Sequence, residues 1–380
     1  MPRVGRAAKV QHTSLCDLPP FVGGLLVRAF KLVFGTGFRW AFALGAISMS
    51  QSKTVRWGIL GVAKINERLL PAFAKSKHAK VVALASRETS RARAAADACG
   101  IPIACGSYED LVRHPEVDVV YNPLPNHLHA KWTREAIEHG KTVLCEKPLC
   151  PTAKEALELV EWVKTKNGRL MDGFMWPHHP RTARLRKLLD SNLLGPVQRV
   201  HGSFTFLMDP IDPNNIRLKP EMGGGSLLDV GCYPVYGIRW AMGAEPVRVF
   251  AHATFLHGVD IDMTGLMEFE DGRVASFDCG FNAPMRMGME IVCGKGVVRV
   301  PRMWLPSNQG EFQVEHEDGS DLCTVEGYDQ ITCMIDHLSE AFLHHKPATP
   351  SPYEAVKSLR VMDALALSAR EGKPVMVVRD

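Results

Sequence analysis

The stretch Val55-Arg56-Trp57-Gly58-Ile59-Leu60-Gly61-Val62-Ala63 indicates how the chain begins to fold. Residues 55–60 are a short, largely apolar run that predicts a strand, and residues 64–75 are predicted to form the next helix. The turn between them, at residues 58–63, has the spacing G-x-x-G-x-A, whose small residues let backbone N–H groups approach a pyrophosphate. A tight turn with packing glycines is the alternative, because the spacing alone is a weak signal. The predicted cofactor contacts of this turn are Gly58, Gly61, Val62, Ala63 and Lys64.

Strands and helices alternate in the next part of the chain. Strands are predicted at residues 80–85, 103–105, 117–121 and 142–145, and helices at residues 89–99, 128–139 and 153–166. Such alternation implies right-handed βαβ units and a parallel sheet, and the near-continuous apolar runs fit strands that are buried on both faces. We therefore predict an α/β fold that starts with a Rossmann dinucleotide-binding domain at residues 54–175.

The rhythm changes after Gly173. Helices are predicted at residues 181–191, 227–242, 331–344 and 353–371, and strands at residues 197–207, 247–256, 264–270, 273–280 and 288–293. Residues 269–273 carry a tight hairpin signal, and successive strands joined by short turns imply an antiparallel sheet. Residues 176–380 are therefore predicted to form a C-terminal α+β domain for substrate binding and oligomerisation.

Residues 1–53 do not share this regularity, and we treat them as an N-terminal extension. Three interpretations stay open: a targeting or interfacial segment, a disordered or loosely packed extension, or sequence upstream of the functional start. The clean apolar run at residues 40–47 is far short of the roughly 20 residues that a membrane span needs. No stable membrane insertion is expected.

The composition excludes several classes of protein. The net charge of +4 is small for 380 residues, and no Lys/Arg stripe is interleaved with aromatic residues, so no nucleic-acid partner is expected. The ten cysteines are scattered without zinc-type spacing, so no metal is expected. Free thiols suit a reducing compartment. We expect a cytoplasmic protein with a small-molecule substrate, with export through the N-terminal segment as the alternative.

The end of the second predicted strand bears on the choice of cofactor. NAD-preferring sites usually carry Asp or Glu here to hold the ribose 2′-hydroxyl, whereas this chain has Ser86 and Arg87. A hydroxyl followed by a guanidinium suits the 2′-phosphate of NADP. We therefore predict NADP, with NAD as a second option through Glu88. A solvated surface charge is the alternative for Arg87.

The loop Asn122-Pro123-Leu124-Pro125-Asn126-His127-Leu128-His129 follows the strand at residues 117–121. Its prolines exclude a helix, and at this position the loop is expected to face the nicotinamide side of the cofactor. Asn126 is a suitable N-cap for the following helix, which is weighed equally with a contact to the ligand. A surface or loop-packing histidine is the alternative for His129. The predicted cofactor contacts are Asn122, Leu124, Asn126 and His129.

The segment Cys145-Glu146-Lys147-Pro148-Leu149 follows the strand at residues 142–145. A Glu-Lys-Pro at the carboxyl end of a strand puts an ammonium group where open α/β sheets bind ligands. The proline biases Lys147 toward an extended backbone and prevents a simple continuation of the strand. We predict that Glu146 and Lys147 contact the cofactor and that Lys147 is also a catalytic residue.

The second distinctive stretch is Gly223-Gly224-Gly225-Ser226-Leu227-Leu228-Asp229-Val230-Gly231-Cys232-Tyr233. Its glycines allow the backbone to approach a substrate, and in the predicted helix Asp229 and Tyr233 share a face. Hydride transfer at an alcohol carbon needs a group that takes or returns the hydroxyl proton. A phenol with a pKa of about 10 does this poorly unless a neighbouring ammonium, here Lys147, lowers that pKa. A half-buried tyrosine and a local cap are the alternative.

These segments, with Phe174-Met175-Trp176 and His179-Pro180, resemble the Gfo/Idh/MocA family over residues 54–380. The resemblance implies a C-terminal domain with an open, mainly antiparallel sheet, a tightly held nicotinamide cofactor, and homodimers or homotetramers formed through the sheet. Tyrosine at position 233 resembles the branch of glucose-fructose oxidoreductase, NADP-dependent D-xylose 1-dehydrogenase and dimeric dihydrodiol dehydrogenase. In that branch the residues that match Lys147 and Tyr233 are the catalytic pair.

One departure from the branch concerns the substrate. Branch members often have Glu-Ala-Phe-Met-Tyr-Arg where this chain has Asp172-Gly173-Phe174-Met175-Trp176-Pro177. Trp176 is predicted to stack on a sugar ring, with a core tryptophan as an equal alternative, and His179 is the second predicted substrate contact.

The sequence as a whole predicts an NADP-preferring oxidoreductase that acts on a sugar or cyclic polyol. Its predicted catalytic residues are Lys147, Tyr233 and Asp229. The alternatives are a dihydrodiol, aldehyde or ketone dehydrogenase of the same branch, and a non-catalytic protein that senses a nicotinamide cofactor.

Overall fold

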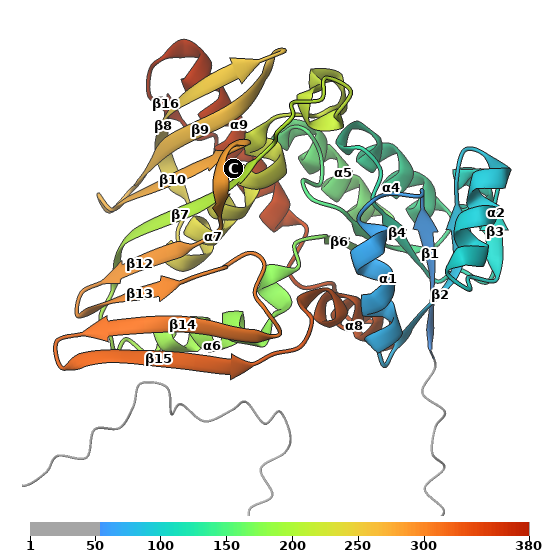
Figure 1. The fold of residues 1–380 in the computed structure, drawn as a ribbon, viewed down its shortest axis with the longest axis horizontal. Helices are drawn as coiled ribbons and strands as arrows, with labels where there is room; N and C mark the ends of the chain where they lie inside the picture. The colour runs from blue at the N-terminus through green and yellow to red at the C-terminus, as the bar shows by residue number, and fades with distance from the viewer. Residues whose placement is uncertain (1–53, 380) are drawn as a thin grey trace, which may run out of the picture. The chain divides into compact units, whose positions relative to one another are not determined.

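The computed structural model describes residues 54–379 (Figure 1). These residues belong to one compact unit that starts at Thr54. The interpretations offered for residues 1–53 lie outside the described residues. Within residues 54–379 no helix is both long and apolar enough to cross a membrane.

The first sheet has six parallel strands in the order β3-β2-β1-β4-β5-β6. The order reverses between β1 and β4, which is where doubly wound sheets bind ligands beyond the carboxyl ends of their strands. This arrangement confirms the predicted Rossmann sheet. The strands are β1 (Val55–Leu60), β2 (Ala79–Ala85), β3 (Ile103–Cys105), β4 (Val119–Asn122), β5 (Thr142–Cys145) and β6 (Leu170–Asp172).

Five helices follow the strands of this sheet. They are α1 (Asn66–Lys75), α2 (Thr89–Ala98), α3 (Tyr108–Arg113), α4 (His129–Glu138) and α5 (Ala153–Thr165). Helix α3 and strand β6 are additions to the predicted elements. A local cap explains α3, because the Ser107 side chain accepts a hydrogen bond from the backbone N–H of Asp110. Strand β6 has only three residues, too few for a periodic pattern.

A helix from late in the chain completes the core of the first sheet. Helix α8 (Gln330–Leu343) lies beside α1 (Figure 1). Its residues Ile331, Met334 and Leu338 belong to the same buried cluster as Trp57 and Phe73. The indole nitrogen of Trp57 donates a hydrogen bond to the Ser339 hydroxyl at 3.1 Å. The apolar face of β1 and α1 is therefore covered by chain that follows it by more than 250 residues.

The second sheet has ten strands and is mainly antiparallel, as predicted. Its order is β15-β14-β13-β12-β7-β10-β9-β8-β16, with β11 also paired to β7, and only β7 and β10 run parallel. The strands are β7 (Val197–Leu207), β8 (Pro246–Leu256), β9 (Val259–Phe269), β10 (Val274–Gly280), β11 (Asn282–Arg286), β12 (Met289–Cys293), β13 (Gly296–Val300), β14 (Gln309–His316), β15 (Gly319–Glu326) and β16 (Val375–Met376).

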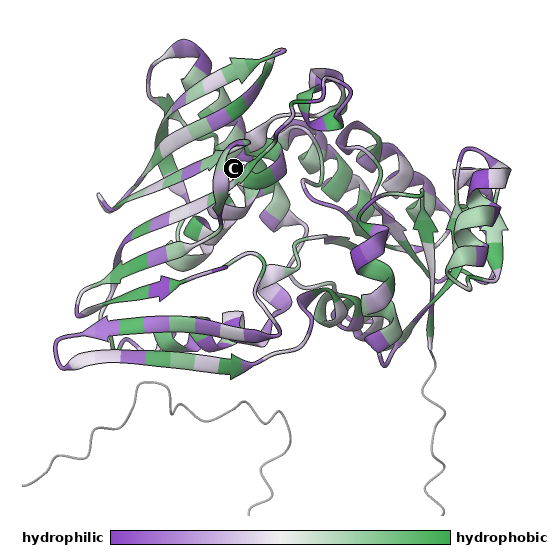
Figure 2. Cartoon of the chain, in the orientation of Figure 1, coloured by the Kyte–Doolittle hydropathy of each residue, from purple (hydrophilic) through white to green (hydrophobic). Residues whose placement is uncertain are grey.

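The hairpin predicted at residues 269–273 joins β9 and β10, and Gly272 takes a positive φ there. Strands β11 and β13–β16 are additions to the predicted elements. Along β14 polar and apolar side chains alternate, as expected for a strand with one covered face (Figure 2). Helix α6 (Pro180–Asp190) lies against β14 and β15.

Helices α7 (Cys232–Met242) and α9 (Tyr353–Glu371) pack against the second sheet. A single π-helical turn, η5 (Leu227–Gly231), precedes α7 where one continuous helix was predicted. At Gly231 an added Cβ would lie 2.8 Å from the Cys279 sulfur, so glycine lets this turn pack closely on β10.

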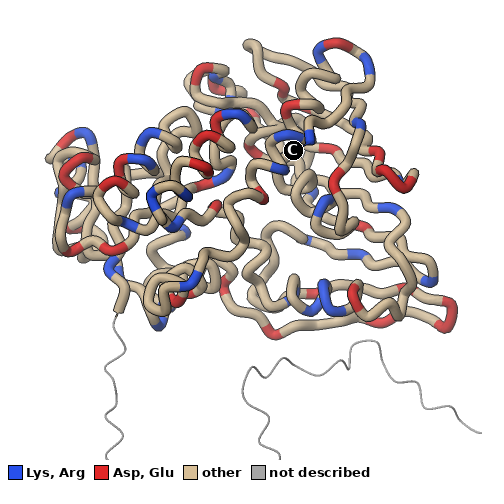
Figure 3. The backbone as a smooth tube through the Cα atoms, turned by 180° about the vertical axis from the view of Figure 1, so that it is seen from behind, with Lys and Arg blue, Asp and Glu red and all other residues tan. Residues whose placement is uncertain are grey.

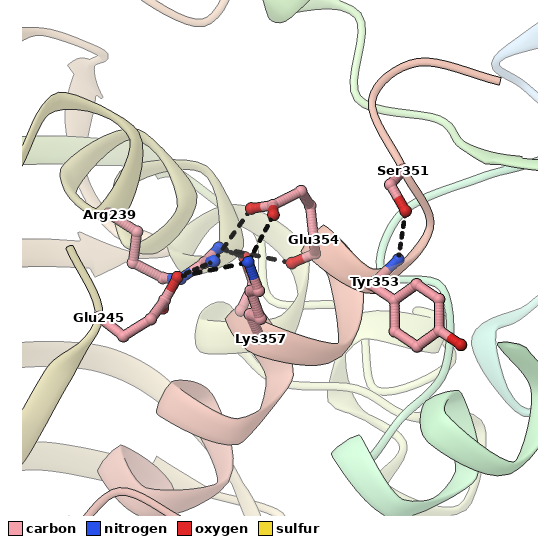
Figure 4. A network of polar contacts seen from close by, with 7 residues as sticks. Arg239, Glu245, Ser351, Tyr353, Glu354 and Lys357 are labelled. Carbon is pink, nitrogen blue, oxygen red and sulfur yellow. Dashed lines mark hydrogen bonds and ion pairs between the residues drawn. The ribbon is translucent and has the colours of Figure 1, made fainter. Parts of the chain in front are cut away.

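The far end of α7 is fastened to α9 by a buried arginine. The Arg239 guanidinium pairs with Glu245 and with Glu354 (Figure 4). It also donates to the Ser358 hydroxyl at 2.8 Å. Burial alone would lower the pKa of Arg239, but the two carboxylates raise it, so the group stays charged. This network fixes the helix whose opposite end carries Tyr233.

Candidate active site

Lys147, Asp229 and Tyr233 meet at the carboxyl edge of the first sheet. Lys147 follows β5, and its ammonium nitrogen donates to the backbone oxygen of Asp229 at 2.6 Å. The same nitrogen lies 3.5 Å from the Asp229 carboxylate and 5.1 Å from the centre of the Tyr233 ring. The structure thus brings together the three residues predicted to be catalytic, although their roles stay a prediction.

Tyr233 is held in an aromatic pocket. Its ring is 4% exposed and packs edge-on against Phe174 and Phe204, with ring centres 5.2 and 5.1 Å away. Burial raises the pKa of the Tyr233 phenol, and Lys147 opposes that rise. Lys147 therefore acts in the predicted direction, but the net shift of the pKa is upward because burial outweighs it.

Asp229 carries two positive neighbours. Its second carboxylate oxygen accepts from the Arg217 guanidinium at 2.6 Å. Burial alone would raise the pKa of Asp229, but Lys147 and Arg217 bring it below its ordinary value. In the same way, burial alone would lower the pKa of Lys147, while Tyr233 and Asp229 raise it. The pair is therefore an ammonium beside a carboxylate.

Glu146 is tied to the neighbouring strand rather than to Lys147's side chain. Its carboxylate accepts from the Tyr121 hydroxyl at 2.6 Å and from the backbone N–H of Lys147 at 3.3 Å. Tyr121 lies near the end of β4, so this contact links the carboxyl ends of two adjacent strands. Burial raises the pKa of Glu146.

The loop of residues 223–225 is held to the segment after β4 by a hydrogen bond from Asn126. The Asn126 amide donates to the backbone oxygen of Gly223 at 2.8 Å. The N-cap prediction for Asn126 is wrong: it begins the short turn η1 (Asn126–Leu128), and α4 starts only at His129. Gly225 has a φ of +113°, and an added Cβ would lie 2.5 Å from the Asp260 carboxylate. These restraints leave a small recess beside Asp229, lined also by Asn126, Arg217 and Gly224.

The first turn of the Rossmann sheet fits a pyrophosphate at Gly61. Gly61 has a φ of +92°, and its carbonyl accepts from the Asn66 amide at 2.9 Å, which fixes the entry to α1. Val62 and Ala63 are half-buried and Lys64 is exposed at the same turn. Gly58 instead lies within β1, where an added Cβ would lie 2.8 Å from the Leu111 side chain. Gly58 was predicted to contact the cofactor, but its position fits the alternative interpretation of a glycine needed for packing.

Two arginines, Arg87 and Arg91, follow the end of β2. Ser86 is buried and Arg87 is exposed, and among residues 54–379 no acidic side chain pairs with Arg87. Arg91, one helical turn later in α2, donates to the backbone oxygen of Val62 at 3.2 Å. Arg91 was not among the predicted cofactor residues, because it lies inside the predicted helix at residues 89–99 rather than at the end of the strand.

The loop after β4 is shaped by two buried residues. Asn122 donates to the backbone oxygen of His129 at 3.1 Å, and both ring nitrogens of His129 contact the carbonyl oxygens of Leu124 and Pro148. Both residues are fully buried, and burial lowers the pKa of His129 to about 4. The predicted cofactor contacts of Asn122 and His129 are therefore replaced by packing of the loop, because their polar atoms are already engaged. The Leu124 side chain lies close to Gly61, where an added Cβ would be 3.2 Å from it.

The two predicted substrate residues are not at the site. Trp176 is fully buried, with its ring centre 5.1 to 5.7 Å from those of Tyr236, Trp240 and Trp304. It is the core tryptophan of the alternative interpretation and has no open face for a sugar. His179 is 1% exposed and caps α6 by accepting from the backbone N–H of Arg181. Both predictions failed because the segment after β6 turns into the interior.

The order of the first sheet, the Gly61 turn and the Lys147–Tyr233 pair together define an oxidoreductase that uses a nicotinamide dinucleotide. Comparison with known proteins agrees. Residues 55–174 match the profile described as an oxidoreductase family with an NAD-binding Rossmann fold, and residues 182–299 match the GFO/IDH/MocA C-terminal domain. The chain belongs to the Gfo/Idh/MocA family.

Three relatives illustrate the similarity. A protein of Haloferax volcanii named D-xylose 1-dehydrogenase (NADP(+)) 2 is 42% identical over 84% of this chain and 98% of its own length. A trans-1,2-dihydrobenzene-1,2-diol dehydrogenase of Xenopus tropicalis is 30% identical over 69% of this chain and 82% of its own. The crystal structure of an aldose-aldose oxidoreductase from Caulobacter crescentus superposes with a TM-score of 0.78 at 27% identity, covering 85% of this chain and all of that one. The predicted family, fold class and enzyme class are confirmed.

Proposed function

We propose that this enzyme oxidises or reduces a sugar or cyclic polyol with NADP, and that Lys147 and Tyr233 handle the hydroxyl proton. The observation that carries the proposal is the position of the Lys147 nitrogen, 2.6 Å from the Asp229 carbonyl oxygen and 5.1 Å from the Tyr233 ring centre. A bound nicotinamide ring supplies the hydride acceptor or donor. The residues of the chain supply the proton chemistry and the orientation.

Tyr233 is the acid–base residue of this proposal. In oxidation its phenolate takes the proton of the substrate hydroxyl, and in reduction its phenol returns that proton. The neighbouring Lys147 ammonium offsets part of the cost of the phenolate. Phe174 and Phe204 pack on the ring and keep water from it, so the charge of Lys147 acts at low dielectric.

Asp229 has two separate tasks. Its backbone oxygen holds the Lys147 amine, and its carboxylate, kept ionised by Arg217 and Lys147, is an acceptor for a second substrate hydroxyl. The adjacent recess is lined by Asp229, Asn126, Arg217 and three glycines, and also by Ile216 and Met222. The charged and amide groups of this lining favour a polyhydroxy substrate over an apolar ring, because they would be left unpaired against the latter.

The relatives support the sugar assignment. The similar proteins from Haloferax volcanii and Caulobacter crescentus are named for D-xylose and for aldoses. The Xenopus tropicalis relative is named for a dihydrobenzenediol, so a dihydrodiol is the second candidate substrate. The polar recess beside Asp229 is the feature of this chain that favours the sugar.

The choice of NADP rests on Arg87 and Arg91. Arg87 follows the end of β2, and Arg91, in the first turn of α2, donates to the Val62 carbonyl beside Gly61. Two guanidinium groups would neutralise a 2′-phosphate dianion, and Ser86 would add a hydroxyl. The NADP(+) in the name of the Haloferax volcanii relative agrees with this assignment.

Initial rates with a panel of aldoses and polyols, and with a trans-dihydrodiol, test the proposed function. NADPH binding is first established by the fluorescence of the cofactor. We expect NADP-dependent turnover of at least one aldose, which Lys147→Ala removes while NADPH still binds. Turnover of the dihydrodiol alone would favour the second candidate. Tight NADPH binding with no turnover of any compound would contradict the enzymatic assignment. It would favour the alternative of a non-catalytic protein that senses the cofactor.

We also propose that the enzyme forms homodimers or homotetramers through its second sheet. The apolar side chains Phe250 and Leu266 are direct partners on β8 and β9 and are 39% and 46% exposed, and Leu322 on β15 is 64% exposed. We propose a cytoplasmic location on the basis of eight free thiols among the described residues, six of them buried. The expectation of free thiols is wrong for Cys323, which is disulfide-bonded. Figure 3 shows Lys and Arg mixed with Asp and Glu along the described backbone.

A further inference from the structure

Asp172 carries a buried carboxyl group on the strand next to the segment that bears Lys147. The proposed proton chemistry does not use this group. It is the last residue of β6, and its partner in the sheet is Cys145, the last residue of β5. The next residue, Gly173, approaches so closely that an added Cβ would lie 2.8 Å from the Cys145 carbonyl oxygen and 3.0 Å from the Glu146 Cα. Asp172 is therefore packed against the backbone that presents Lys147.

The surroundings of Asp172 provide no cation of its own. The residue is 9% exposed, and its Oδ1 atom is fully buried without a hydrogen-bond partner among residues 54–379. The carboxyl group accepts from the backbone N–H of Gly173. The titratable groups that face it are Cys145, Glu146, Lys147 and Cys150 from the β5 side, and Cys232 and Tyr236 from α7.

Of the three carboxyl groups in this region, that of Asp172 is the one with no cation paired to it among residues 54–379. Lys147 and Arg217 are the cations beside Asp229, and the charge of Arg68 acts on Glu146. Asp229 pairs with both cations, and Glu146 has the Tyr121 hydroxyl as a donor. An unpaired buried carboxylate is costly, so the third acid keeps its proton. In agreement, burial together with Glu146 raises the pKa of Asp172 to about 7, and Lys147 only partly opposes this.

We propose that Asp172 is a positioning residue for the reaction: as a neutral carboxyl group it leaves the charge of Lys147 available to Tyr233, and its ionisation weakens that effect. When Asp172 loses its proton to solvent, its carboxylate becomes a second negative charge, besides that of Asp229, that interacts with the Lys147 ammonium. That charge competes with the Tyr233 phenolate for the ammonium group and makes the phenolate harder to form. The reaction role of Asp172 rests on the proposed function, whereas its protonation state does not.

Infrared difference spectroscopy of the full chain tests the protonation state without any turnover. We expect a protonated-carboxyl band in the wild type at pH 6 that fades on going to pH 8 and that is missing in Asp172→Asn. Asp318→Asn is the matched control, because Asp318 is exposed in the turn between β14 and β15 and its loss leaves the band intact. A wild-type spectrum at pH 6 without the band overturns the proposal.

The pH profile of kcat then tests the reaction role. Because Asp172→Asn cannot ionise, we expect the rise of kcat for sugar oxidation to move to lower pH by about one unit, with the dissociation constant of NADPH unchanged. A merely structural role would lower stability and leave the profile where it was, and an unchanged profile overturns the proposal. If no substrate turns over while the carboxyl band is present, the proposed function fails, and the reaction role of Asp172 fails with it.

The stability of the variant provides a further check. The folded-state pKa of Asp172 lies above the ordinary value of 3.8, so the wild type loses stability as pH rises from about 4 through about 7. Asp172→Asn avoids this loss and is expected to gain in melting temperature relative to the wild type over that range. If the asparagine variant does not fold, Asp172→Glu keeps an ionisable acid and should retain both the band and the pH dependence. Loss of the band in a folded Asp172→Glu contradicts the proposal.

Discussion

Lys147 contacts the main chain of Asp229 more closely than its carboxylate: the ammonium nitrogen is 2.6 Å from the carbonyl oxygen and 3.5 Å from Oδ1. The other carboxylate oxygen of Asp229, Oδ2, pairs with Nε of Arg217 at 2.6 Å. The lysine is therefore positioned by a neutral acceptor that no side-chain substitution at position 229 removes. Its charge is not fully neutralised by Asp229, which leaves it available to Tyr233.

Lys147→Ala is expected to reduce kcat by about 10²- to 10⁴-fold, the range typical of acid–base groups, with NADPH affinity changed by less than threefold. The reason is that the Tyr233 phenolate loses its only close ammonium among the described residues. Steady-state kinetics and cofactor fluorescence measure the two effects. Lys164→Ala, on the exposed face of α5, is the control and should behave like the wild type. Full activity in the Lys147 variant would remove the assigned role.

Tyr233→Phe is expected to abolish turnover and to preserve the fold. The phenyl ring keeps the edge-on contacts with Phe174 and Phe204, while the hydroxyl that exchanges the proton is gone. Kinetics and thermal melting check this pair of outcomes. Tyr236→Phe, on the next turn of α7, removes a hydroxyl from the same helix and should retain turnover. Equal losses in the two variants would contradict a specific role for Tyr233.

Arg87→Ala and Arg91→Ala are each expected to reduce the preference for NADP over NAD by about tenfold or more, because each removes a charge from the proposed 2′-phosphate site. The ratio of kcat/KM for the two cofactors measures the effect. The matched control is Arg93→Ala, an exposed arginine of the same helix. A ratio that stays constant in both variants would exclude these arginines from cofactor selection.

Arg239→Ala is expected to destabilise the chain by about 2–3 kcal/mol, because a buried guanidinium is removed from two carboxylates and a serine. The estimate is below the value for a fully buried pair, since Glu245 and Glu354 are 40% and 33% exposed. Urea unfolding measures the change. Arg248→Ala breaks an exposed pair with Glu268 and should cost about 0–1 kcal/mol. Similar costs for the two variants would contradict the anchoring of α7.

The sequence was sufficient for five of the six strands of the first sheet, for β7–β10 and β12 of the second, and for the convergence of Lys147 with Tyr233. Those features follow from apolar periodicity and from the rule that ligands bind beyond the carboxyl ends of parallel strands. The position of α8 could not be predicted, because its packing on Trp57 depends on contacts far apart in the chain. Trp176 and His179 were misplaced for the same reason: burial is decided by which partners a segment meets, and Tyr236, Trp240 and Trp304 all come from later in the chain.

The placement of α8 has a consequence for biosynthesis. The apolar side of the first sheet stays uncovered until residues 330–343 have left the ribosome, because those residues supply Ile331, Met334 and Leu338 to its core. A fragment that ends near residue 175 would expose Trp57 and Phe73 to water and would aggregate instead of binding a dinucleotide. The core of the nucleotide-binding half is thus completed only when α8 has been synthesised.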